Sequence, residues 1–320
     1  MPAMSELRQD PLSGRWFVLA AERARRPEPF HRPARQWPAS GDCPFCPGNE
    51  AMTTNEVLRY EDDAGNWQVR IVPNKYADMA DPTGDTAEYG EPLCWRKPSA
   101  GFADVLIESR QHDVTFANHP PGQTTRIVQA IQERYQALRD IPGLAVIMPF
   151  RNYLQESGAS LGHPHGQILA SSHLPPVLEL EAARFAAHGT CLGCDMADAE
   201  GDGPRVISEV GDYLILAPYA SRSAFEILIL PRRCAPDLTG IDPEPFAAAL
   251  QDAYARLNRV LADPPTNMWI HGRPLNARTP FHWHAHLMPR LTVEGAWELG
   301  SGLAVNVVAP EQAAGALQAG

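Results

Sequence analysis

Two histidines and a glutamine occupy alternate positions in the segment His163-Pro164-His165-Gly166-Gln167. Alternate side chains of an extended chain point to the same face, so His163, His165 and Gln167 are expected to face one way. One imidazole can then bind a metal while the other reacts. An imidazole is neutral at pH 7 and keeps a lone pair on one nitrogen, which can attack phosphorus. We therefore predict His165 as a nucleophile and Gln167 as an amide donor to phosphate oxygens. The alternative is a pair of ordinary surface or core histidines.

The cysteines indicate two closed zinc sites. Four of the six cysteines form two C-x-x-C pairs, which in a reducing compartment favour a metal over a disulfide. Four protein ligands leave zinc no open position, so such a site is structural. The first predicted set is Cys43, Cys46, His112 and His163, and the second, aligned by an internal repeat, is Cys191, Cys194, Cys234 and His282. The alternative is free thiols with unrelated histidines nearby.

A further group of ligand types lies around the second histidine-rich segment. A carboxylate with several imidazoles suits iron or zinc. The residues of this set are Glu181, His271, His284 and His286. The alternative is that these histidines are core or hydrogen-bonded groups.

Phosphate binding requires cations, and nucleotide binding requires polar groups for the base or ribose. Arg23 and Arg26 follow an apolar run at 16–20 and supply guanidinium groups. Asn74 and Asn152 are candidates for the base or ribose. The alternative is a solvated basic turn for the two arginines and ordinary polar loop residues for the two asparagines.

The chain contains an internal duplication, and the elements of each copy must position the residues named above. In each half a C-x-x-C pair precedes an apolar run, an amphipathic helix, a second apolar run and a histidine-rich segment. The predicted strands are 104–111 and 144–150 in the first half, and 226–233 and 267–271 in the second. The helical faces are Ile127, Ile131, Tyr135 and Leu138, and then Phe246, Leu250, Tyr254 and Leu257. We predict a duplicated α+β unit with mostly antiparallel sheet, divided into residues 1–178, which carry the nucleophile, and 179–320.

Composition limits the class of protein. The chain has 320 residues and a net charge of −11, which argues against a non-specific nucleic-acid binder because that class needs a basic face. No apolar run approaches the length of a membrane span, and the N-terminus lacks the pattern of a secretory signal. We expect a cytoplasmic protein with small-molecule partners, no nucleic acid and no membrane.

Together, these motifs resemble those of the galactose-1-phosphate uridylyltransferases of the histidine triad superfamily. The resemblance covers nearly the whole chain, at residues 7–16, 22–27, 43–49, 69–75, 158–167 and 281–289. It implies a fold of two histidine-triad-like half-barrels with crossover helices, and a homodimer. It implies Zn2+ at the first Cys/His set, and it places the Glu181 set on the ligands of a second metal, Zn2+ or Fe2+, that some members hold.

The resemblance also implies residue roles and a reaction. His165 would carry the uridylyl group, and the backbone carbonyl of His163 would orient its ring. Gln167 and Ser160 would contact phosphate, while Arg23, Arg26, Asn74 and Asn152 would hold the nucleotide. The implied reaction is ping-pong: UDP-glucose gives UMP to His165, and the hexose 1-phosphate acceptor, galactose 1-phosphate, then takes it.

Some residues depart from that pattern. The Cys191–Cys194 pair, Cys234 and residues 297–306 are more similar to the ADP-glucose phosphorylases, which use phosphate as the acceptor for AMP. The sequence therefore leaves three functions open. They are uridylyl transfer between hexose 1-phosphates, phosphorolysis of ADP-glucose or another nucleotide sugar through an adenylyl-histidine, and a zinc-stabilised binding module without activity.

Overall fold

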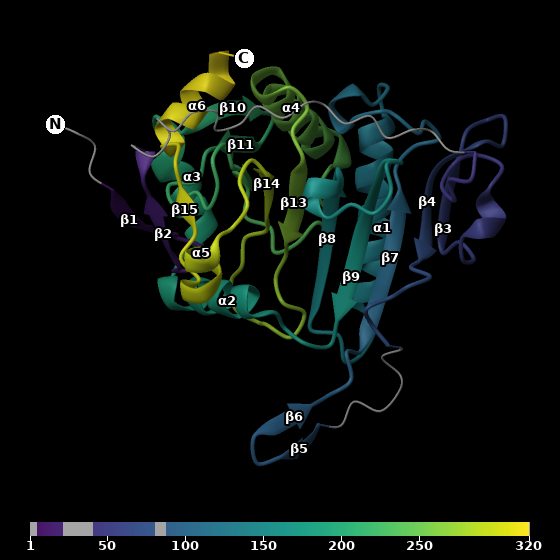
Figure 1. Cartoon of the computed structure of the whole chain (residues 1–320), viewed down its shortest axis with the longest axis horizontal. Coiled ribbons are helices and arrows are strands. Elements are labelled where there is room, and N and C mark those ends of the chain that lie inside the picture. Colours follow the sequence, from purple (N-terminus) through teal and green to yellow (C-terminus); the bar gives the residue numbers. More distant parts are fainter. Residues whose placement is uncertain (1–4, 22–40, 81–87, 320) are drawn as a thin grey trace.

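One ten-stranded sheet forms the centre of the protein (Figure 1). The computed structural model describes residues 5–21, 41–80 and 88–319. The first five strands, in sheet order, are β3 (Leu58–Glu61), β4 (Trp67–Pro73), β7 (Gly101–Ile107), β9 (His165–Ser171) and β8 (Val146–Tyr153). The next five are β13 (Thr266–His271), β14 (His284–Pro289), β12 (Ile227–Pro231), β11 (Tyr213–Leu216) and β10 (Val206–Val210).

The two groups of five strands repeat one arrangement about the β8–β13 pair. Outward from that pair, the order is β8-β9-β7-β4-β3 on one side and β13-β14-β12-β11-β10 on the other. All pairs within the sheet are antiparallel, including β8 with β13, where Phe150 lies opposite Trp269. The predicted duplicated α+β unit with mostly antiparallel sheet is confirmed, and the two halves share one continuous sheet.

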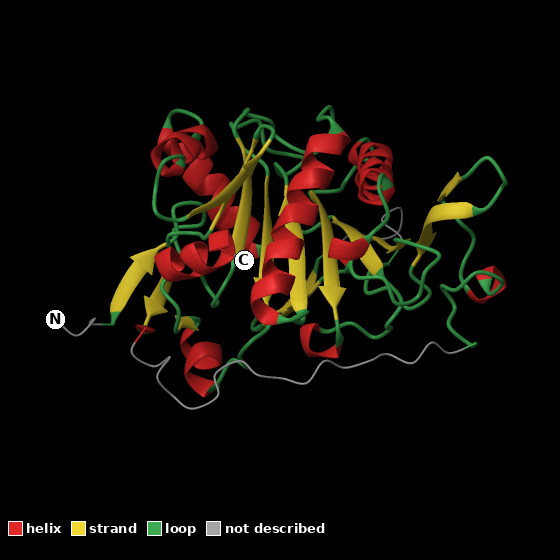
Figure 2. Ribbon diagram, turned by 90° about the horizontal axis from the view of Figure 1, so that it is seen from above, coloured by secondary structure: helices red, strands yellow, loops and turns green. Residues whose placement is uncertain are grey.

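The two long helices, α1 (Gln123–Arg139) and α4 (Pro243–Leu261), pack against each other on one face of this sheet. Figure 2 shows the helices flanking the strands. Each predicted apolar helix face is buried in the main core, against alternate strand residues such as Ile168, Ala170 and Ile270. Because side chains alternate along a strand, the residues between these, such as Gln167 and Trp269, point to the opposite face.

Among the residues that the structure describes, the apolar clusters on that opposite face lie at its two ends. At one end, α2 (Pro176–His188) and α3 (Leu192–Glu200) pack on Leu214, Leu216, Leu228 and Leu230. At the other end, the Cys43 loop packs on Trp67, Val105 and Ile107. The central strands β9, β8, β13 and β14 therefore carry their polar side chains between two apolar blocks.

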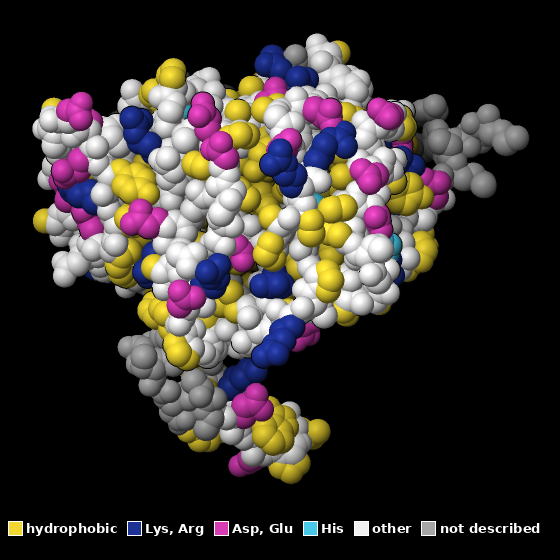
Figure 3. Space-filling view, turned by 180° about the vertical axis from the view of Figure 1, so that it is seen from behind, with side chains coloured by type: hydrophobic (Ala, Val, Ile, Leu, Met, Phe, Trp, Pro, Cys, Tyr) yellow, Lys and Arg dark blue, Asp and Glu magenta, His cyan; other side chains and the backbone are white. Residues whose placement is uncertain are grey.

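The remaining elements lie around the sheet. They are the three-stranded sheet of β1 (Glu6–Gln9), β2 (Trp16–Leu19) and β15 (Val305–Asn306), the helices α5 (Ala296–Ser301) and α6 (Pro310–Ala319), the hairpin of β5 (Tyr89–Glu91) and β6 (Cys94–Arg96), and the 3-10 turns η2 (Glu50–Met52), η3 (Phe116–Asn118) and η4 (Gln155–Ser157). The hairpin projects from the body (Figure 1 and Figure 3). Its Leu93 and Trp95 are 99% and 73% exposed. Within the described ranges, none of the helices combines the length and apolar character that crossing a bilayer requires.

Candidate functional site

His165 begins strand β9 and is held in one orientation by its own backbone. Its Nδ1 lies 2.8 Å from the carbonyl oxygen of His163, as the resemblance implied. A carbonyl only accepts a hydrogen bond, so the proton stays on Nδ1 and the lone pair is on Nε2. Burial lowers the pKa of His165 below its ordinary value, and this keeps the ring neutral. The side chain therefore has the form that a nucleophile needs.

Cys43, Cys46, His112 and His163 converge next to His165. One ligand atom from each lies within 4.8 Å of all the others. The Cys46 Sγ is 3.3 Å from His112 Nδ1 and 3.5 Å from His163 Nδ1. Tetrahedral zinc, with bonds of about 2.3 Å to sulfur and about 2.0 Å to nitrogen, separates such atoms by roughly 3.6 Å. Burial and the Cys43 thiol raise the pKa of Cys46 to about 11, so a thiolate pair requires a cation. The donor set fits zinc.

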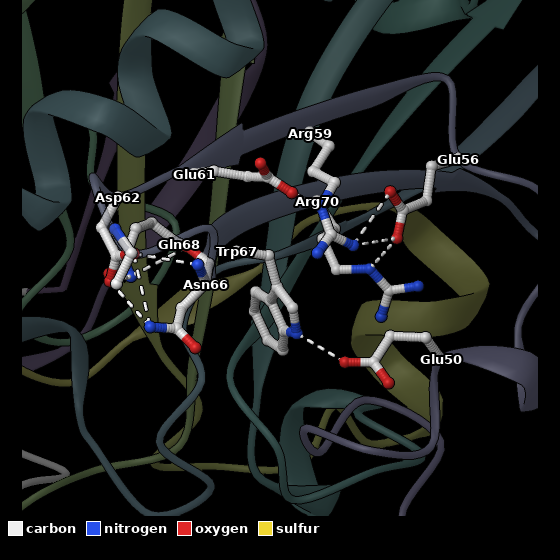
Figure 4. Close-up of polar contacts among 10 residues, drawn as sticks. Glu50, Glu56, Arg59, Glu61, Asp62, Asn66, Trp67, Gln68 and Arg70 are labelled. Atoms are coloured by element: carbon white, nitrogen blue, oxygen red, sulfur yellow. Dashed lines mark hydrogen bonds and ion pairs between the residues drawn. The ribbon is translucent and has the colours of Figure 1, made fainter.

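The loop that carries Cys43 and Cys46 is fastened to strand β4. Glu50 follows the loop and accepts hydrogen bonds from the Gly48 amide at 2.9 Å and from the Trp67 indole at 2.7 Å (Figure 4). Trp67 is 1% exposed and packs with Cys43 in one apolar cluster. The guanidinium of Arg70 lies 5.4 Å from the Trp67 ring and is paired with Glu56. The cysteine loop is therefore anchored independently of any metal.

The two residues after β7 fix the backbone around His165. The Glu108 amide donates to the Pro164 carbonyl at 3.1 Å, and His163 Nε2 donates to the Ser109 carbonyl at 2.7 Å. With Nε2 protonated, His163 offers Nδ1 to a metal, an arrangement that is usual for metal-binding histidines. Burial lowers the pKa of His163 to about 4, so this ring is neutral as well.

Beneath this segment lies a buried ion pair. Arg151 Nε donates to Glu108 at 2.8 Å and 3.1 Å, and both side chains are almost fully buried. A Cβ added at Gly166 would lie 3.5 Å from the Glu108 carboxylate, so that carboxylate sits directly under the residue that follows His165. Burial alone would raise the pKa of Glu108, but Arg151 and His119 lower it to about 2. The pair therefore stays ionised and links β7 to β8 under the reactive segment.

The second Cys/His set also converges. Cys191, Cys194, Cys234 and His282 place their ligand atoms within 4.8 Å of one another. The Cys191 Sγ is 3.3 Å from His282 Nδ1, and the Cys194 Sγ is 3.7 Å from it. Burial and the neighbouring thiols raise the pKa of Cys194 to about 12, so this set also needs a cation to ionise. His284 repeats the geometry of His165, with its Nδ1 at 3.1 Å from the His282 carbonyl.

The third set comes together only in part. Glu181, His271 and His284 lie within 4.8 Å of one another. The His284 Nε2 is buried and forms no hydrogen bond within the described part of the chain, which fits a metal ligand. Burial would raise the pKa of Glu181, but His271 and His284 hold it well below its ordinary value. The predicted fourth member, His286, lies outside this group, because its Nδ1 is held at 3.0 Å by Glu226 and its ring stacks on Trp269.

The predicted substrate residues have different surroundings. Gln167 and Asn152 are partly exposed on the uncovered face of the sheet, and Ser160 is exposed in the loop that leads to His163. Asn74 follows β4, and its Oδ1 accepts from the Tyr76 amide at 3.0 Å. Arg23 and Arg26 fall outside the described residues.

A cavity of about 470 Å³ opens on the same face as His165 and extends toward the second half. It is lined from β8, β13 and β14, and by residues of α2 and of the segment 10–17. Asn152, His271 and His286 contribute to its wall, whereas His165 and Gln167 do not.

Sequence reasoning missed Glu108, Ser109 and Arg151. A carboxylate after a strand and an arginine within another look like ordinary surface charges, because nothing local indicates that both are buried. Glu108, Ser109 and Arg151 acquire their contacts only where β7, β8 and β9 come together in the sheet. The order of apolar runs predicted the strands themselves but not the contacts at their ends.

Comparison with known proteins finds galactose-1-phosphate uridylyltransferases and an ADP-glucose phosphorylase. The family model described as "Galactose-1-phosphate uridyl transferase, N-terminal domain" matches residues 2–175. ADP-glucose phosphorylase of Arabidopsis thaliana is 29% identical over 97% of this chain and 91% of its own length. Galactose-1-phosphate uridylyltransferase of Thermotoga maritima is 27% identical over 97% of both proteins.

Solved structures agree with the sequence relatives. The Arabidopsis thaliana ADP-glucose phosphorylase with bound ADP-glucose has a TM-score of 0.83 at 26% identity, with 98% of this chain and 99% of that chain covered. A structure described as a uridylyltransferase has a TM-score of 0.75 at 26% identity, with 99% and 98% covered.

Proposed function

This chain belongs to the galactose-1-phosphate uridyl transferase family, and from that membership we propose that it moves a nucleotidyl group between phosphate acceptors through a covalent bond to His165. One observation carries the proposal. The hydrogen bond between His165 Nδ1 and the His163 carbonyl leaves Nε2 as the free nucleophilic nitrogen. The relatives named as uridylyltransferases and as ADP-glucose phosphorylase all support nucleotidyl transfer.

The reaction proceeds in two displacements. In the first, His165 Nε2 attacks the phosphorus that carries the nucleoside, an N–P bond forms, and the sugar 1-phosphate leaves with the electrons of the broken P–O bond. In the second, an oxygen of the acceptor phosphate attacks the same phosphorus, and the N–P bond breaks to free the imidazole. Gln167 donates its amide N–H groups to the phosphate oxygens and stabilises their charge in both steps.

The reaction that we propose is UMP transfer from UDP-glucose to galactose 1-phosphate. Several relatives, among them the Thermotoga maritima protein, are named galactose-1-phosphate uridylyltransferase, which supports this choice. ADP-glucose phosphorolysis is the second candidate, because the Arabidopsis phosphorylase matches this chain over almost its whole length at a TM-score of 0.83. In that reaction AMP is carried by His165 and accepted by inorganic phosphate.

Metals belong to the proposal as structural components. Zinc held by Cys43, Cys46, His112 and His163 would fix the loop that presents His165 and would leave no position for substrate. The second set would act in the same way in the other half, and the Glu181 set would take zinc or iron(II). Ser160, Asn74 and Asn152 are proposed substrate contacts, together with Arg23 and Arg26.

The proposal includes an assembly of two halves. Residues 1–178 and 179–320 are the proposed units, and the repeated order of five strands in each supports this division. The proposed boundary falls inside α2. We further propose a homodimer in the cytoplasm, where a reducing compartment would keep the paired cysteines available for metal.

Intact-protein mass spectrometry tests the proposed function directly. The protein is incubated with UDP-glucose or ADP-glucose and then freed of ligand. A mass gain of one UMP or one AMP names the nucleotidyl group, and its discharge by galactose 1-phosphate or by inorganic phosphate names the acceptor. The absence of any adduct with both donors would reject the covalent mechanism.

A further inference from the structure

Three arginines converge at the cavity of about 470 Å³ that spans the junction of β8 with β13 and β14. Arg15, Arg222 and Arg290 all line it. Arg222 donates to Glu294 at 2.6 Å, and this bond lowers the pKa of Glu294, to which the charges of Arg290 and Arg15 add. One carboxylate therefore lies near three guanidinium groups. Within the described residues, neither the Arg15 nor the Arg290 guanidinium forms a hydrogen bond or ion pair, and the Arg15 guanidinium lies 5.3 Å from the centre of the Phe17 ring.

The carboxylates that line the cavity do not balance these charges, because each is engaged elsewhere. Asp10 accepts from the backbone amides of Leu12 and Ser13. Glu181 is held by His271 at 3.0 Å, and Glu226 is held by His286 at 3.0 Å and by the Arg222 amide at 2.6 Å. The guanidinium groups of Arg15 and Arg290 are therefore available to an anion from solution. Planar guanidinium forks suit phosphate oxygens in particular.

The rest of the wall suits a nucleobase. The partly exposed rings of Phe150 and Trp269 lie along the cavity, and aromatic rings of this kind stack on bases. Asn267 Nδ2 donates to Asn152 Oδ1 at 2.7 Å and to the Ser157 carbonyl at 2.8 Å, which leaves the Asn267 Oδ1 without a hydrogen bond in the described chain. This amide oxygen can accept a hydrogen bond from the edge of a base. The volume falls within the range of about 300–1,000 Å³ that is usual for small-molecule sites.

The duplication explains why a nucleotide bound in this cavity would not react with the protein. The counterpart of His165 in the second half is His284, which has the same hydrogen bond to a carbonyl two residues earlier. His284 is fully buried, however, and its Nε2 faces the Glu181 carboxylate at 3.6 Å. The carboxylate stands where a phosphate would have to approach. His165 itself does not line the cavity.

We propose that this cavity is a second, unreactive binding site for a nucleoside phosphate, with Arg15, Arg222 and Arg290 at the phosphate and Phe150 and Trp269 at the base. The site goes beyond the proposed transfer reaction, because it needs no covalent bond and because neither His165 nor Gln167 lines it.

Equilibrium dialysis of radiolabelled UMP and AMP against the zinc-replete His165→Gly protein tests the proposal, because covalent capture is then impossible. We expect two nucleotides per chain for at least one of the two probes. Arg290→Gln should weaken one of the two sites by about tenfold or more, since a charge-assisted hydrogen bond is lost, and leave the other unchanged. Trp269→Leu should weaken the same site for the nucleotide but not for inorganic phosphate. Arg233→Gln is the matched control, because Arg233 is 84% exposed and pairs with Asp212.

Three results would overturn the proposal. One is a single nucleotide per chain with both probes. Another is unchanged two-site binding in correctly folded Arg290→Gln and Trp269→Leu proteins, with zinc content and thermal midpoint as the folding checks. The third is loss of the His165 adduct when Arg290→Gln is made alone, which would assign the cavity to the reactive site. Failure of the proposed transfer reaction looks different: the unmodified chain would form no adduct, whatever the dialysis shows.

Discussion

The Nδ1 atom of His165 lies 2.8 Å from the backbone carbonyl oxygen of His163. This contact couples the reactive ring to a residue whose own ring faces Cys46 and whose Nε2 is bonded to Ser109. A displacement of His163 would therefore turn His165 and alter which nitrogen is free. The Cys/His set and the proposed nucleophile are therefore structurally coupled through the backbone of His163.

Replacing His165 with glycine should abolish adduct formation. Removal of a nucleophile lowers the rate by several orders of magnitude, because no neighbouring group can form the covalent bond. The zinc ligands are untouched, so the zinc content should equal that of the unmodified protein. Mass spectrometry and metal analysis measure both quantities. His173→Gly is the control, because His173 is an exposed loop residue. Full activity in His165→Gly would show that another residue carries the nucleotide.

Replacing Cys43 with serine should remove one zinc and destabilise the first half. A closed zinc site contributes its binding free energy to folding, so we expect a loss of several kcal/mol. The expected readouts are one fewer zinc per chain and a lower midpoint of thermal unfolding. Cys94→Ser is the matched control, because Cys94 lies exposed on the projecting hairpin. Equal zinc content in the Cys43→Ser and Cys94→Ser proteins would contradict the assignment.

Gly193 lies between the cysteines of the second pair and leaves no space for a side chain. An added Cβ would lie 2.3 Å from Cγ of the His282 ring. Because His282 is a ligand of the second set and fully buried, it cannot move aside without leaving the metal. Gly193→Ala should therefore lower the zinc content toward one per chain. Gly300→Ala is the control, since nothing lies within 4 Å of its added Cβ. Unchanged zinc in Gly193→Ala would disprove this packing argument.

Glu108 should make stability depend on pH in the acid range. Its pKa is about 2 in the folded protein, against 4.5 ordinarily. Because the folded value is depressed, the contribution is fully present above about pH 4.5 and is lost as the pH falls toward 2. Linkage gives about 3 kcal/mol for this difference. Denaturant unfolding of the unmodified and Glu108→Gln proteins across this range measures it, and the variant should show the flatter profile.

Glu108→Gln should also destabilise the protein at pH 7. The charge of Arg151 would remain buried without a counter-charge, which costs about 3–5 kcal/mol. The same substitution at Glu61, which is exposed on the short strand β3, serves as the control. Equal unfolding free energies for the two variants would mean that the Glu108–Arg151 pair does not hold the segment beneath His165.

The division between sequence and structure follows the range of the interactions involved. Apolar periodicity predicted both long helices and the central strands, because it depends only on neighbours along the chain. The duplicated order of motifs predicted the two Cys/His sets, whose members the fold does bring together. The hydrogen-bond partner of His286 could not be predicted in this way. Its position next to His284 is evident from the sequence, but the partner that holds its ring, Glu226, comes from another strand.

The sequence by itself determined the types of chemical group and their order: the alternating histidines at 163 and 165, the two C-x-x-C pairs, and two copies of one α+β unit. Only the tertiary structure decided how these groups differ between the copies. The packing of α2 places Glu181 against His284, while strand pairing puts Glu108 and Arg151 beneath His165. Two similar sequences thus acquire different reactivity, because accessibility and charge pairing depend on which distant segments pack against each copy.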